Sequence, residues 1–419
     1  MELGTILKGL KQCFRGVPLN DGRAKIGPYE FVVSLIFCFT QDRGARTIAC
    51  LREEIIRLTG KSVSRGSFWE RLATERLLTL LLELTLRCVE MVAQGSYQTQ
   101  QISDLLKTLG ISGVLVLDSS SVSLRDMAGL YFPGPRSNVA PAVVKWHSCF
   151  DLFGGILKWF DISPGTSHDS NHFPDLATLV GKLIIFDLGY WGYALLESID
   201  AVGGFFLSRV KSNATIFILD VVCGLPKTAI GKELFGRRIA KGQKIIELVA
   251  MLGNSNTPVR VIGFWNFIEK RYHWYTTNLL VDAEVIYPLY RVRWQTELLF
   301  KKAKSSLRLK DITSTNPNII QSMLLATIVA TTIAHPVAFM AALLDKNNRE
   351  AMQLPTIQRA GKLLVHLSQE WVDFLLTDKK RNMDILIKKI KLLTSELYDP
   401  NLKRESSIQR VFRIVKKCA

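Results

Sequence analysis

Two short apolar runs that each end on an aspartate decide the fold of this chain: Gly113-Val-Leu-Val-Leu-Asp118 and Lys182-Leu-Ile-Ile-Phe-Asp187. Runs of this length, rich in branched and aromatic residues, are typical of buried strands. A single aspartate at such a place is often only a turn or helix-capping residue. Two of them bring carboxylates to the same edge of one sheet, which is where open α/β sheets carry their sites.

Further strands are predicted around these two runs. Residues 143–152 and 156–162 have strand-like composition, and Gly154-Gly155 between them predicts a hairpin. Residues 204–210 form another apolar run after the second aspartate. From about residue 215 to residue 276, strand patterns alternate with basic turns, which predicts a β-rich insertion with a positive surface. The fold class expected from these patterns is α/β.

Helical patterns flank the strands on both sides. Apolar residues at three- and four-residue spacing predict helices from Ile48 to Leu58 and from Phe68 to Val92. Ser67-Phe-Trp-Glu70 has the form of a capping box at the start of the second helix. The basic turn that joins the two fits a module that reads DNA, but the same pattern describes any helical hairpin. From Asp345 onward the chain is amphipathic and rich in Lys and Arg.

The stretch Tyr290-Arg-Val-Arg-Trp-Gln-Thr-Glu297-Leu-Leu-Phe-Lys-Lys-Ala-Lys304 carries one carboxylate among five basic side chains, and no Gly or Pro interrupts it. At roughly 100° per residue in a helix, Tyr290, Arg293, Glu297 and Lys304 fall within an arc of about 60°. The stretch therefore predicts one helix with a phenol, a guanidinium, a carboxylate and an ammonium on one face. A simpler alternative is a solvated face with an ion pair between Arg293 and Glu297.

The charge of the chain indicates an anionic partner. Its 419 residues hold 54 Lys and Arg against 37 Asp and Glu, a formal net charge of +17. Such a charge says nothing about fold, but it favours association with nucleic acid or an anionic membrane surface. Nucleic acid is the preferred interpretation, because the basic residues are scattered through globular sequence and are not gathered into a polybasic tail.

The seven cysteines form no Cys-x-x-Cys pair and have no histidine partners at zinc-finger spacing. Reduced, buried thiols in a cytosolic protein are therefore expected. The N-terminus also lacks the pattern of a signal peptide.

A membrane anchor is the one alternative that the composition raises. No charged residue occurs from Met323 to Leu344, which is about the length needed to span a bilayer. The segment contains threonines, many alanines and a His335-Pro336 pair. We favour a buried helix of the protein core, because a spanning helix would bring the Tyr290–Lys304 stretch to the membrane surface without any visible reason.

With these residues in view, the chain resembles the bacterial cut-and-paste DDE transposases of the insertion-sequence-four family. Their signature is Tyr, two residues, Arg, three residues, Glu, six residues, Lys, and the chain matches it at Tyr290, Arg293, Glu297 and Lys304. The family's second-aspartate motif, Asp-x-Gly-Tyr/Phe, matches Asp187-Leu-Gly189-Tyr190. The sequence around three further segments also resembles that of the family: Val144–His147, Pro164–Asp169 and Thr277–Leu279. The likeness spans about residues 110 to 320.

The resemblance implies a ribonuclease H-like catalytic core that a β-strand insertion interrupts between the second aspartate and the glutamate. The chain then divides as follows: a helical N-terminal region that binds DNA ends (1–105), the first part of the core (106–214), the β-rich insertion (215–276), the rest of the core (277–345), and a helical C-terminal region for DNA contact or dimerisation (346–419).

The resemblance also implies a role for each site residue. Asp118, Asp187 and Glu297 are the expected catalytic residues and would hold two Mg²⁺ ions, for which Mn²⁺ substitutes, with Asp118 bridging both. Carboxylates suit Mg²⁺ because it is a hard cation that prefers oxygen. Tyr290, Arg293 and Lys304 would bind DNA phosphates.

Four further residues also have expected roles. Trp265 and Trp274 are candidates for stacking on a flipped base, and the alternative for each is a buried core residue. His147 and His168 are interpreted as phosphate or structural contacts, because three carboxylates already fill the oxygen-rich site.

The function implied is metal-dependent DNA cleavage and strand transfer at the inverted-repeat ends of an insertion sequence. The expected partners are terminal and target DNA, with a homodimer on the DNA, in the bacterial cytoplasm and without a membrane. An alternative of another class is a transposase-derived DNA-binding protein without catalytic activity. That alternative gives no reason for both aspartates and all four signature positions to remain.

Overall fold

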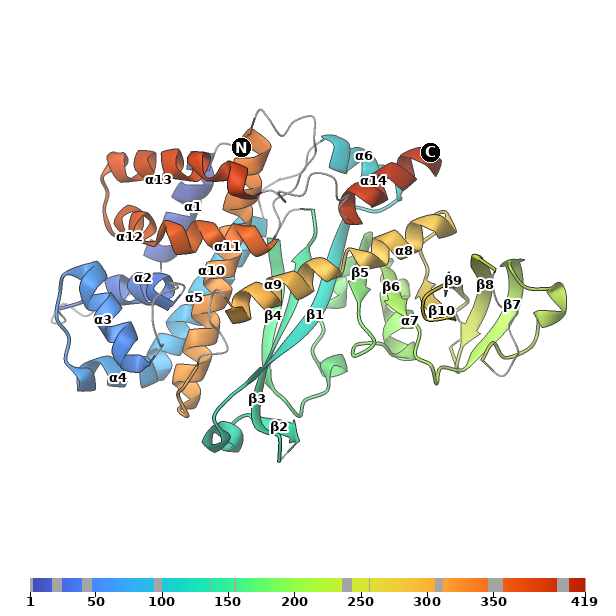
Figure 1. Ribbon diagram of the computed structural model, residues 1–419, viewed down its shortest axis with the longest axis horizontal. Coiled ribbons are helices and arrows are strands. Elements are labelled where there is room, and N and C mark those ends of the chain that lie inside the picture. Colours follow the sequence, from blue (N-terminus) through green and yellow to red (C-terminus); the bar gives the residue numbers. More distant parts are fainter. Residues whose placement is uncertain are drawn as a thin grey trace.

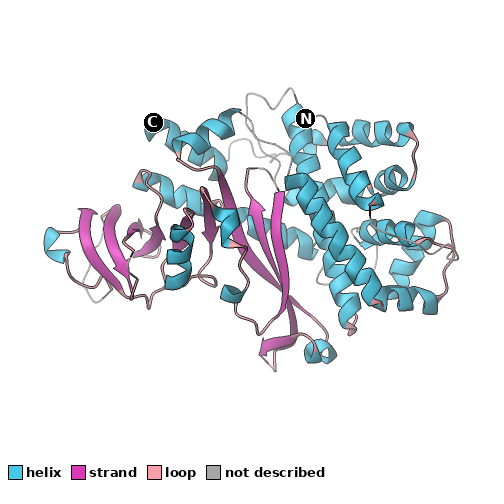
Figure 2. Ribbon diagram, turned by 180° about the vertical axis from the view of Figure 1, so that it is seen from behind, coloured by secondary structure: helices cyan, strands magenta, loops and turns pink. Residues whose placement is uncertain are grey.

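A ten-stranded mixed sheet extends from the centre of the protein to one end, beside a body of helices, and further helices pack against its faces (Figure 1). The computed structural model describes residues 3–16, 25–39, 47–93, 100–136, 138–153, 156–235, 243–255, 257–305, 312–345, 357–397 and 407–418. The predicted hairpin turn at Gly154-Gly155 lies outside these residues. Figure 2 shows the same sheet from behind, with the helical body beside it.

The strands are β1 (Gly113–Ser123), β2 (Pro133–Arg136), β3 (Ala140–Asp151), β4 (Ile156–Pro164), β5 (Lys182–Phe186), β6 (Phe205–Arg209), β7 (Ile216–Cys223), β8 (Ile245–Leu252), β9 (Val259–Asn266) and β10 (Arg271–Thr277). The α-helices before the sheet are α1 (Leu3–Arg15), α2 (Pro28–Phe39), α3 (Ile48–Thr59), α4 (Arg65–Ala73), α5 (Glu75–Ala93) and α6 (Gln100–Thr108). Those that follow are α7 (Tyr193–Ala201), α8 (Ala283–Arg291), α9 (Trp294–Ser305), α10 (Pro317–Leu344), α11 (Ile357–His366), α12 (Ser368–Leu376), α13 (Lys380–Leu392) and α14 (Ser407–Cys418). Short 3₁₀ turns are η1 (Asp126–Leu130), η2 (Asp169–Asn171), η3 (Leu176–Leu179), η4 (Lys227–Ala229) and η7 (Thr394–Leu397).

The centre of the sheet has the strand order β4-β3-β1-β5-β6. β1, β3 and β4 are successive antiparallel neighbours, while β5 runs parallel to β1 and β6 runs parallel to β5. This order with these directions is that of a ribonuclease H-like core. The predicted fold class is therefore confirmed.

The strands of the predicted insertion continue the same sheet in the order β6-β10-β9-β8-β7. β10 pairs with β6 in antiparallel fashion, with Tyr275 opposite Arg209. Asn278, just after β10, accepts a hydrogen bond from the Phe206 amide and donates to the Gly204 carbonyl oxygen, at 2.9 Å each. The Thr277–Leu279 segment thus connects the end of the insertion to the core strand β6 by hydrogen bonds.

β1 is longer than the sequence predicts. It does not end at Asp118 but continues to Ser123, because β3 keeps pairing with it as far as Ser123 opposite Val143. β5, on the other side, ends at Phe186 opposite Leu117. Asp118 is therefore a mid-strand residue that lies where one neighbouring strand has stopped.

Alternate residues of β1 point to opposite faces of the sheet. Val114 and Val116 join the core on the face that α8, α9 and α10 cover, and Asp118 continues that series. Leu115 and Leu117 join the core on the opposite face, which includes residues of α7, and Ser119 continues that series. Adjacent residues of β1 therefore face different environments on the two sides of the sheet.

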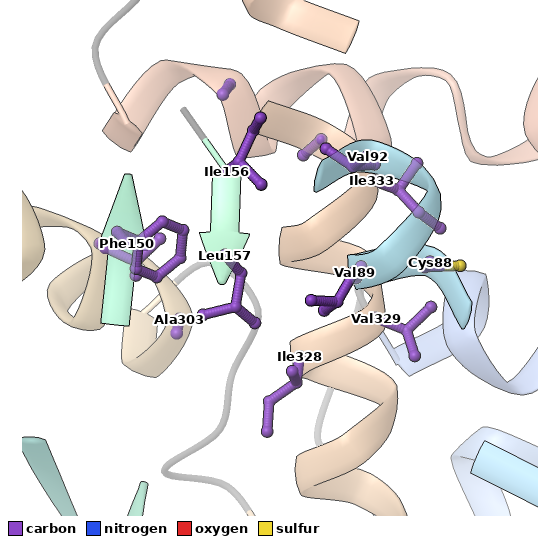
Figure 3. Close-up of a cluster of buried hydrophobic side chains, with 14 of the residues drawn as sticks. Cys88, Val89, Val92, Phe150, Ile156, Leu157, Ala303, Ile328, Val329 and Ile333 are labelled. Carbon is purple, nitrogen blue, oxygen red and sulfur yellow. The ribbon is translucent and has the colours of Figure 1, made fainter. Parts of the chain in front are cut away.

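The helices before and after the sheet form one body around α10. α10 packs against α1, α2 and α5 from the N-terminal region and against α11 and α13 from the C-terminal region. Figure 3 shows Val89 of α5 and Ile328 and Val329 of α10 near Phe150 and Leu157 of the sheet. The two helical regions therefore share one core with the sheet.

α10 is the segment that raised the membrane alternative. It is long and apolar enough to span a bilayer, and its whole apolar window is buried inside the protein. Its threonines donate to carbonyl oxygens four residues earlier, as Thr327 does to Met323 at 3.0 Å, so their hydroxyls are satisfied in the apolar core. The interpretation as a buried core helix agrees with this burial.

The predicted helix from Phe68 to Val92 is wrong as a single element. It is divided at Thr74, which has extended backbone angles between α4 and α5 and whose hydroxyl accepts from the Leu77 amide at 3.3 Å, so that it caps α5. α4 starts earlier than predicted, because Ser64 is its N-cap and accepts from the Ser67 amide. The capping box predicted at Ser67 therefore does not form.

The prediction of buried cysteines holds only in part: among the cysteines whose side chains are described, Cys38, Cys88 and Cys149 are buried, Cys13 and Cys50 are half-buried, and Cys223 is exposed. The six whose side chains are described are all free thiols: Cys13, Cys38, Cys50, Cys88, Cys149 and Cys223. Burial raises the pKa of the Cys149 thiol to about 12, so this thiol stays protonated and unreactive at neutral pH.

Burial in α10 lowers the pKa of His335 to about 4, below the value of about 6.5 in an unfolded chain. Between these two values the unfolded chain takes up the proton and the folded protein does not, so acidification favours unfolding. We expect the free energy of unfolding to fall as pH falls from about 6.5 to 4, by up to about 3 kcal/mol from this residue. Urea unfolding at a series of pH values measures it.

His335→Gln should reduce that pH dependence, leaving the part that comes from the other buried histidine, His147, whereas His366→Gln, at an exposed histidine of α11, should leave it as in the wild type. An unchanged pH slope in His335→Gln would show that His335 is not the group that titrates.

Candidate active site

Asp118 and Asp187 lie side by side at the edge where β5 ends. β1 and β5 are parallel neighbours whose last paired residues are Leu117 and Phe186, so the two aspartates are the next residue on each strand. Asp118 is buried and Asp187 is half-buried. The structure therefore brings together the two acids that the sequence predicted at one sheet edge.

The Tyr290–Lys304 stretch is not one helix, contrary to the prediction. α8 ends at Arg291 and α9 begins at Trp294, and across the join the hydrogen bonds span three residues, from the Val292 amide to Leu289 and from the Arg293 amide to Tyr290. The tightened turn buries Val292 in the core. It also turns the Arg293 side chain toward β1, which explains a break without any Gly or Pro. The rotation of about 100° per residue consequently does not describe the four signature residues.

Arg293 joins two of the three acids directly. Its Nη1 donates to Asp118 Oδ2 at 2.7 Å, and its Nη2 donates to Glu297 Oε1 at 2.5 Å. The Arg293 side chain is only 14% exposed, and its Nε is a buried donor without a hydrogen-bond partner among the described residues. The simple ion pair with Glu297 exists, but Arg293 binds a buried strand carboxylate as well.

Tyr290 connects the third acid to this group. Its hydroxyl donates to Asp187 Oδ1 at 3.3 Å, and the Arg293 guanidinium lies 5.8 Å from the centre of its ring. Asp118, Asp187 and Glu297 thus converge on the Tyr290–Arg293 turn from β1, from the end of β5 and from α9.

The charges of the site shift its pKa values. Burial raises the pKa of Asp118 to about 6, with smaller contributions from the Asp187 and Glu297 carboxylates, and Arg293 opposes the rise. Burial disfavours the charge of Arg293, but Asp118, Tyr290, Asp187 and Glu297 together outweigh burial and raise the guanidinium pKa. Burial also raises the pKa of Tyr290 to about 12. The site therefore concentrates negative charge that a cation must balance.

The donor set has the right chemistry for a hard divalent cation, since all three acids offer carboxylate oxygens. Within the described ranges, however, no group of three or more His, Cys, Asp or Glu residues is arranged to hold a metal ion. Arg293 lies between Asp118 and Glu297 and supplies the positive charge there. The three acids thus have the chemistry of a metal site, and in this structure they form hydrogen bonds with Arg293 and Tyr290.

Lys304 lies half-buried on α9, two turns beyond Glu297, and burial lowers its pKa. Its placement on the same helix as Glu297 agrees with the signature spacing.

The two predicted base-stacking tryptophans differ in their exposure. Trp274 is buried, and a Cβ added to Gly263 would lie 2.6 Å from its ring, so the ring is packed against backbone and is not available to a base. Its role is the alternative one, a core residue. Trp265 is half-buried and makes an edge contact with Tyr272.

An aromatic residue that the sequence interpretation missed is Trp294. It is 56% exposed at the start of α9, between Arg293 and Glu297. Its place inside the signature stretch was the available signal.

The two histidines have no part in the carboxylate group. His147 is buried between the Tyr190 hydroxyl and the Ser163 hydroxyl, each at 2.9 Å, and burial lowers its pKa to about 4. His168 is exposed and caps η2 by accepting from the Ser170 amide. Both have structural contacts in this protein.

Comparison with known proteins gives a consistent result. A family model described as a transposase DDE domain matches residues 110–333. The chain is 23% identical over 330 residues to the transposase for insertion sequence element IS231B of Bacillus thuringiensis subsp. berliner, covering 65% of this chain and 67% of that protein. It is 21% identical over 304 residues to the transposase for IS1151 of Clostridium perfringens, covering 61% and 64%.

Two other similarities are more limited. A putative transposase, y4zB, of Sinorhizobium fredii is 27% identical over 228 residues, covering 51% of this chain and 58% of that protein. The cryo-EM structure of a piggyBac transposase synaptic complex with hairpin DNA aligns with 99% of this chain and 86% of that chain, with a TM-score of 0.46 and 10% identity. Similarity at that level adds nothing to the strand order described above.

Replacing Arg293 tests the charge balance without reference to function. Arg293→Gln leaves Asp118 buried without its counter-charge, so we expect the free energy of unfolding at pH 7 to fall by about 3–5 kcal/mol in metal-free buffer. The double variant Arg293→Gln/Asp118→Asn should recover most of the loss, because the unpaired charge is gone. Chemical denaturation measures both.

Arg291→Gln, at the exposed arginine two residues earlier, is the matched control and should change stability by less than about 0.5 kcal/mol. Equal stability of Arg293→Gln and wild type would contradict the charge balance described here.

Proposed function

Because this chain belongs to the transposase DDE domain family, whose model matches residues 110–333, we propose that it cleaves DNA and transfers strands at the inverted-repeat ends of an insertion sequence. The observation that carries this proposal is the convergence of Asp118, Asp187 and Glu297 on one turn from three separate elements. A fold maintained only for packing has no use for three carboxylates at one place, since burial, and to a smaller extent the Asp187 and Glu297 carboxylates, disfavours the charge of Asp118 and raises its pKa.

Asp118, Asp187 and Glu297 are proposed to hold two Mg²⁺ ions, with Mn²⁺ as a substitute. When bound, two such ions activate the attacking oxygen and stabilise the leaving oxygen in phosphodiester chemistry. Asp118 would be the central ligand of the proposed site, because it is the most buried of the three acids and its pKa responds to both of the others. Arg293 balances Asp118 and Glu297 in the structure, and bound ions would supply that positive charge in its place.

Arg293, Tyr290 and Lys304 are proposed to bind the DNA phosphates next to the scissile bond. A guanidinium presents a planar fork that fits two phosphate oxygens, and an ammonium acts as a point charge. Arg293 would thus exchange carboxylates for phosphate when DNA and ions bind. Half-burial of Lys304 agrees with a position beside the site.

DNA is the proposed partner, in the form of terminal inverted repeats and target DNA. The net charge of +17 supports an extended phosphate contact. Residues 1–105 are proposed to bind the DNA ends, and residues 346–419 to serve DNA contact or dimerisation. A homodimer on DNA follows from the need to hold two ends together. The proposed setting is the bacterial cytoplasm, with no membrane involved.

The alternative is a DNA-binding protein without catalysis. The observation in its favour is the occupation of Asp118 and Glu297 by Arg293, which leaves no ready metal site among the described residues. Wild-type cleavage of end-bearing DNA would remove this alternative.

Glu297→Gln should abolish Mg²⁺-dependent cleavage of a duplex that carries the element's end, because an amide does not replace a carboxylate ligand. End binding should stay within about twofold, since the variant removes one negative charge and no phosphate contact. Gel assays of cleavage and binding on the same duplex measure both. The control is Glu284→Gln, at an exposed residue of α8, which should cleave as the wild type does. Persistent cleavage in Glu297→Gln would exclude Glu297 from the site.

Trp294 is the proposed base-stacking residue, because its exposed ring adjoins Arg293, while Trp274 is buried and Trp265 is half-buried. Stacking of one base on an aromatic ring contributes about 1–3 kcal/mol. Trp294→Ala should therefore reduce the fluorescence rise of 2-aminopurine placed at the end of the element, and Trp265→Ala should reduce it less. If the order of the two effects is reversed, Trp265 is the stacking residue.

A further inference from the structure

A polar cluster lies behind the candidate active site, on the face of the sheet that carries α7. Asp169, in the turn that follows β4, accepts a hydrogen bond from the Ser119 hydroxyl at 3.0 Å and one from Lys145 of β3 at 2.9 Å. Lys145 also donates to the Ser167 carbonyl oxygen at 2.7 Å, so it holds the loop that bears Asp169. The Lys145 and Asp169 side chains are 16% and 22% exposed.

One contact of Asp169 acts on the strand that carries Asp118. Ser119 is the next residue of β1, and its amide donates to Asp118 Oδ1 at 2.9 Å. Because neighbouring residues of a strand point to opposite faces, Ser119 faces Asp169 while Asp118 faces Arg293. Asp169 therefore fixes the backbone at Asp118 from the far side of the sheet.

Its second contact acts on the turn that carries Asp187. Gly189 approaches Asp169 so closely that an added Cβ would lie 2.7 Å from Asp169 Oδ2 and 3.4 Å from its Cβ and Cγ. The turn is closed by the Tyr190 amide, which donates to the Asp187 carbonyl oxygen at 3.1 Å. The glycine of the Asp-x-Gly-Tyr motif is thus needed for contact with Asp169, and its backbone angles do not require glycine.

The cluster is anchored at its buried end. The Tyr190 hydroxyl contacts His147 Nδ1 at 2.9 Å, and His147 Nε2 contacts the Ser163 hydroxyl at 2.9 Å, all three residues being buried. Tyr190 follows Gly189 directly, so this end holds the same turn. The turn that Asp169 contacts is therefore held in place by buried hydrogen bonds.

We infer that Asp169 is a positioning residue that sets the separation of the Asp118 and Asp187 carboxylates, by holding β1 through Ser119 and the turn after β5 through Gly189. This inference rests on the proposed function, in which those two carboxylates hold metal ions. Asp169 acts from the opposite face and contacts neither ion nor DNA. Its loss therefore weakens metal binding without removing a ligand.

The experiment separates positioning from support of the fold by a cycle of Asp169→Ala, Lys145→Met and the double variant. Each single change leaves a largely buried charge unpaired, so both should lower the free energy of unfolding, and the double variant should regain most of it. Free Mn²⁺, followed by its paramagnetic resonance signal, is titrated against each protein bound to an end duplex. We expect at least tenfold weaker Mn²⁺ binding in Asp169→Ala, and the same loss in the double variant despite its recovered stability.

Gly189→Ala provides a second test that leaves the ion pair in place. The added methyl group must push the turn away from Asp169, so Mn²⁺ binding should weaken in the same direction. Gly192→Ala is the matched control, because nothing lies within 4 Å of a Cβ at that position and its extended backbone suits any residue. Its Mn²⁺ affinity should equal that of the wild type.

Three outcomes would count against these statements in distinguishable ways. Unchanged Mn²⁺ binding in Asp169→Ala, or binding that recovers together with stability in the double variant, would overturn the positioning role while leaving the proposed function intact. Equal affinity in Gly189→Ala and Gly192→Ala would also overturn it. A wild-type protein that neither binds Mn²⁺ nor cleaves end-bearing DNA would contradict the proposed function itself, and with it the inference.

Discussion

The interaction on which the site depends is the contact of one guanidinium with two carboxylates from different elements. Asp118 is 8% exposed, and a charge so deeply buried is tolerated only with a partner. Arg293 provides that partner and at the same time holds Glu297, so it joins the strand β1 to the helix α9. The break between α8 and α9 lies at this residue, where the Arg293 side chain meets β1. A cation is thus built into the place where the proposed chemistry needs one.

The sheet makes this contact possible by ending one strand early. β5 stops at Phe186, beside Leu117, whereas β3 keeps β1 extended to Ser123. Asp118 is consequently held rigidly on one side and has no strand neighbour on the other. Because the side chains of β1 alternate between the two faces of the sheet, Asp118 contacts Arg293 on one face and Ser119 contacts Asp169 on the other. Two adjacent residues therefore connect the site with the cluster that supports it.

Much of the architecture could be predicted, because buried strands have a clear composition. The runs that end at Asp118 and Asp187 were enough to place two acids on neighbouring strands, and the signature spacing added Glu297. The serines after Asp118 hid the continuation of β1, since their strand conformation comes from pairing with β3 and not from their own propensity. The break at Arg293 was equally invisible, because no Gly or Pro marks it in the sequence. Asp169 was missed because its partners Ser119 and Gly189 lie 50 residues before it and 20 residues after it.

The helical regions at the two ends of the chain share one hydrophobic core with the strands and helices that carry the site. One hydrophobic core continues from Leu51 of α3 and Leu84 of α5, through α10, to Val116 of β1 and Leu299 of α9. α10, fully buried, contacts helices from both ends of the chain, so its apolar composition reflects its central position. A region that shares its core with the sheet does not move as a separate module. If the N-terminal helices bind a DNA end as proposed, the distance from that end to Asp118 would be set by this shared core, and recognition and cleavage would be coupled through it.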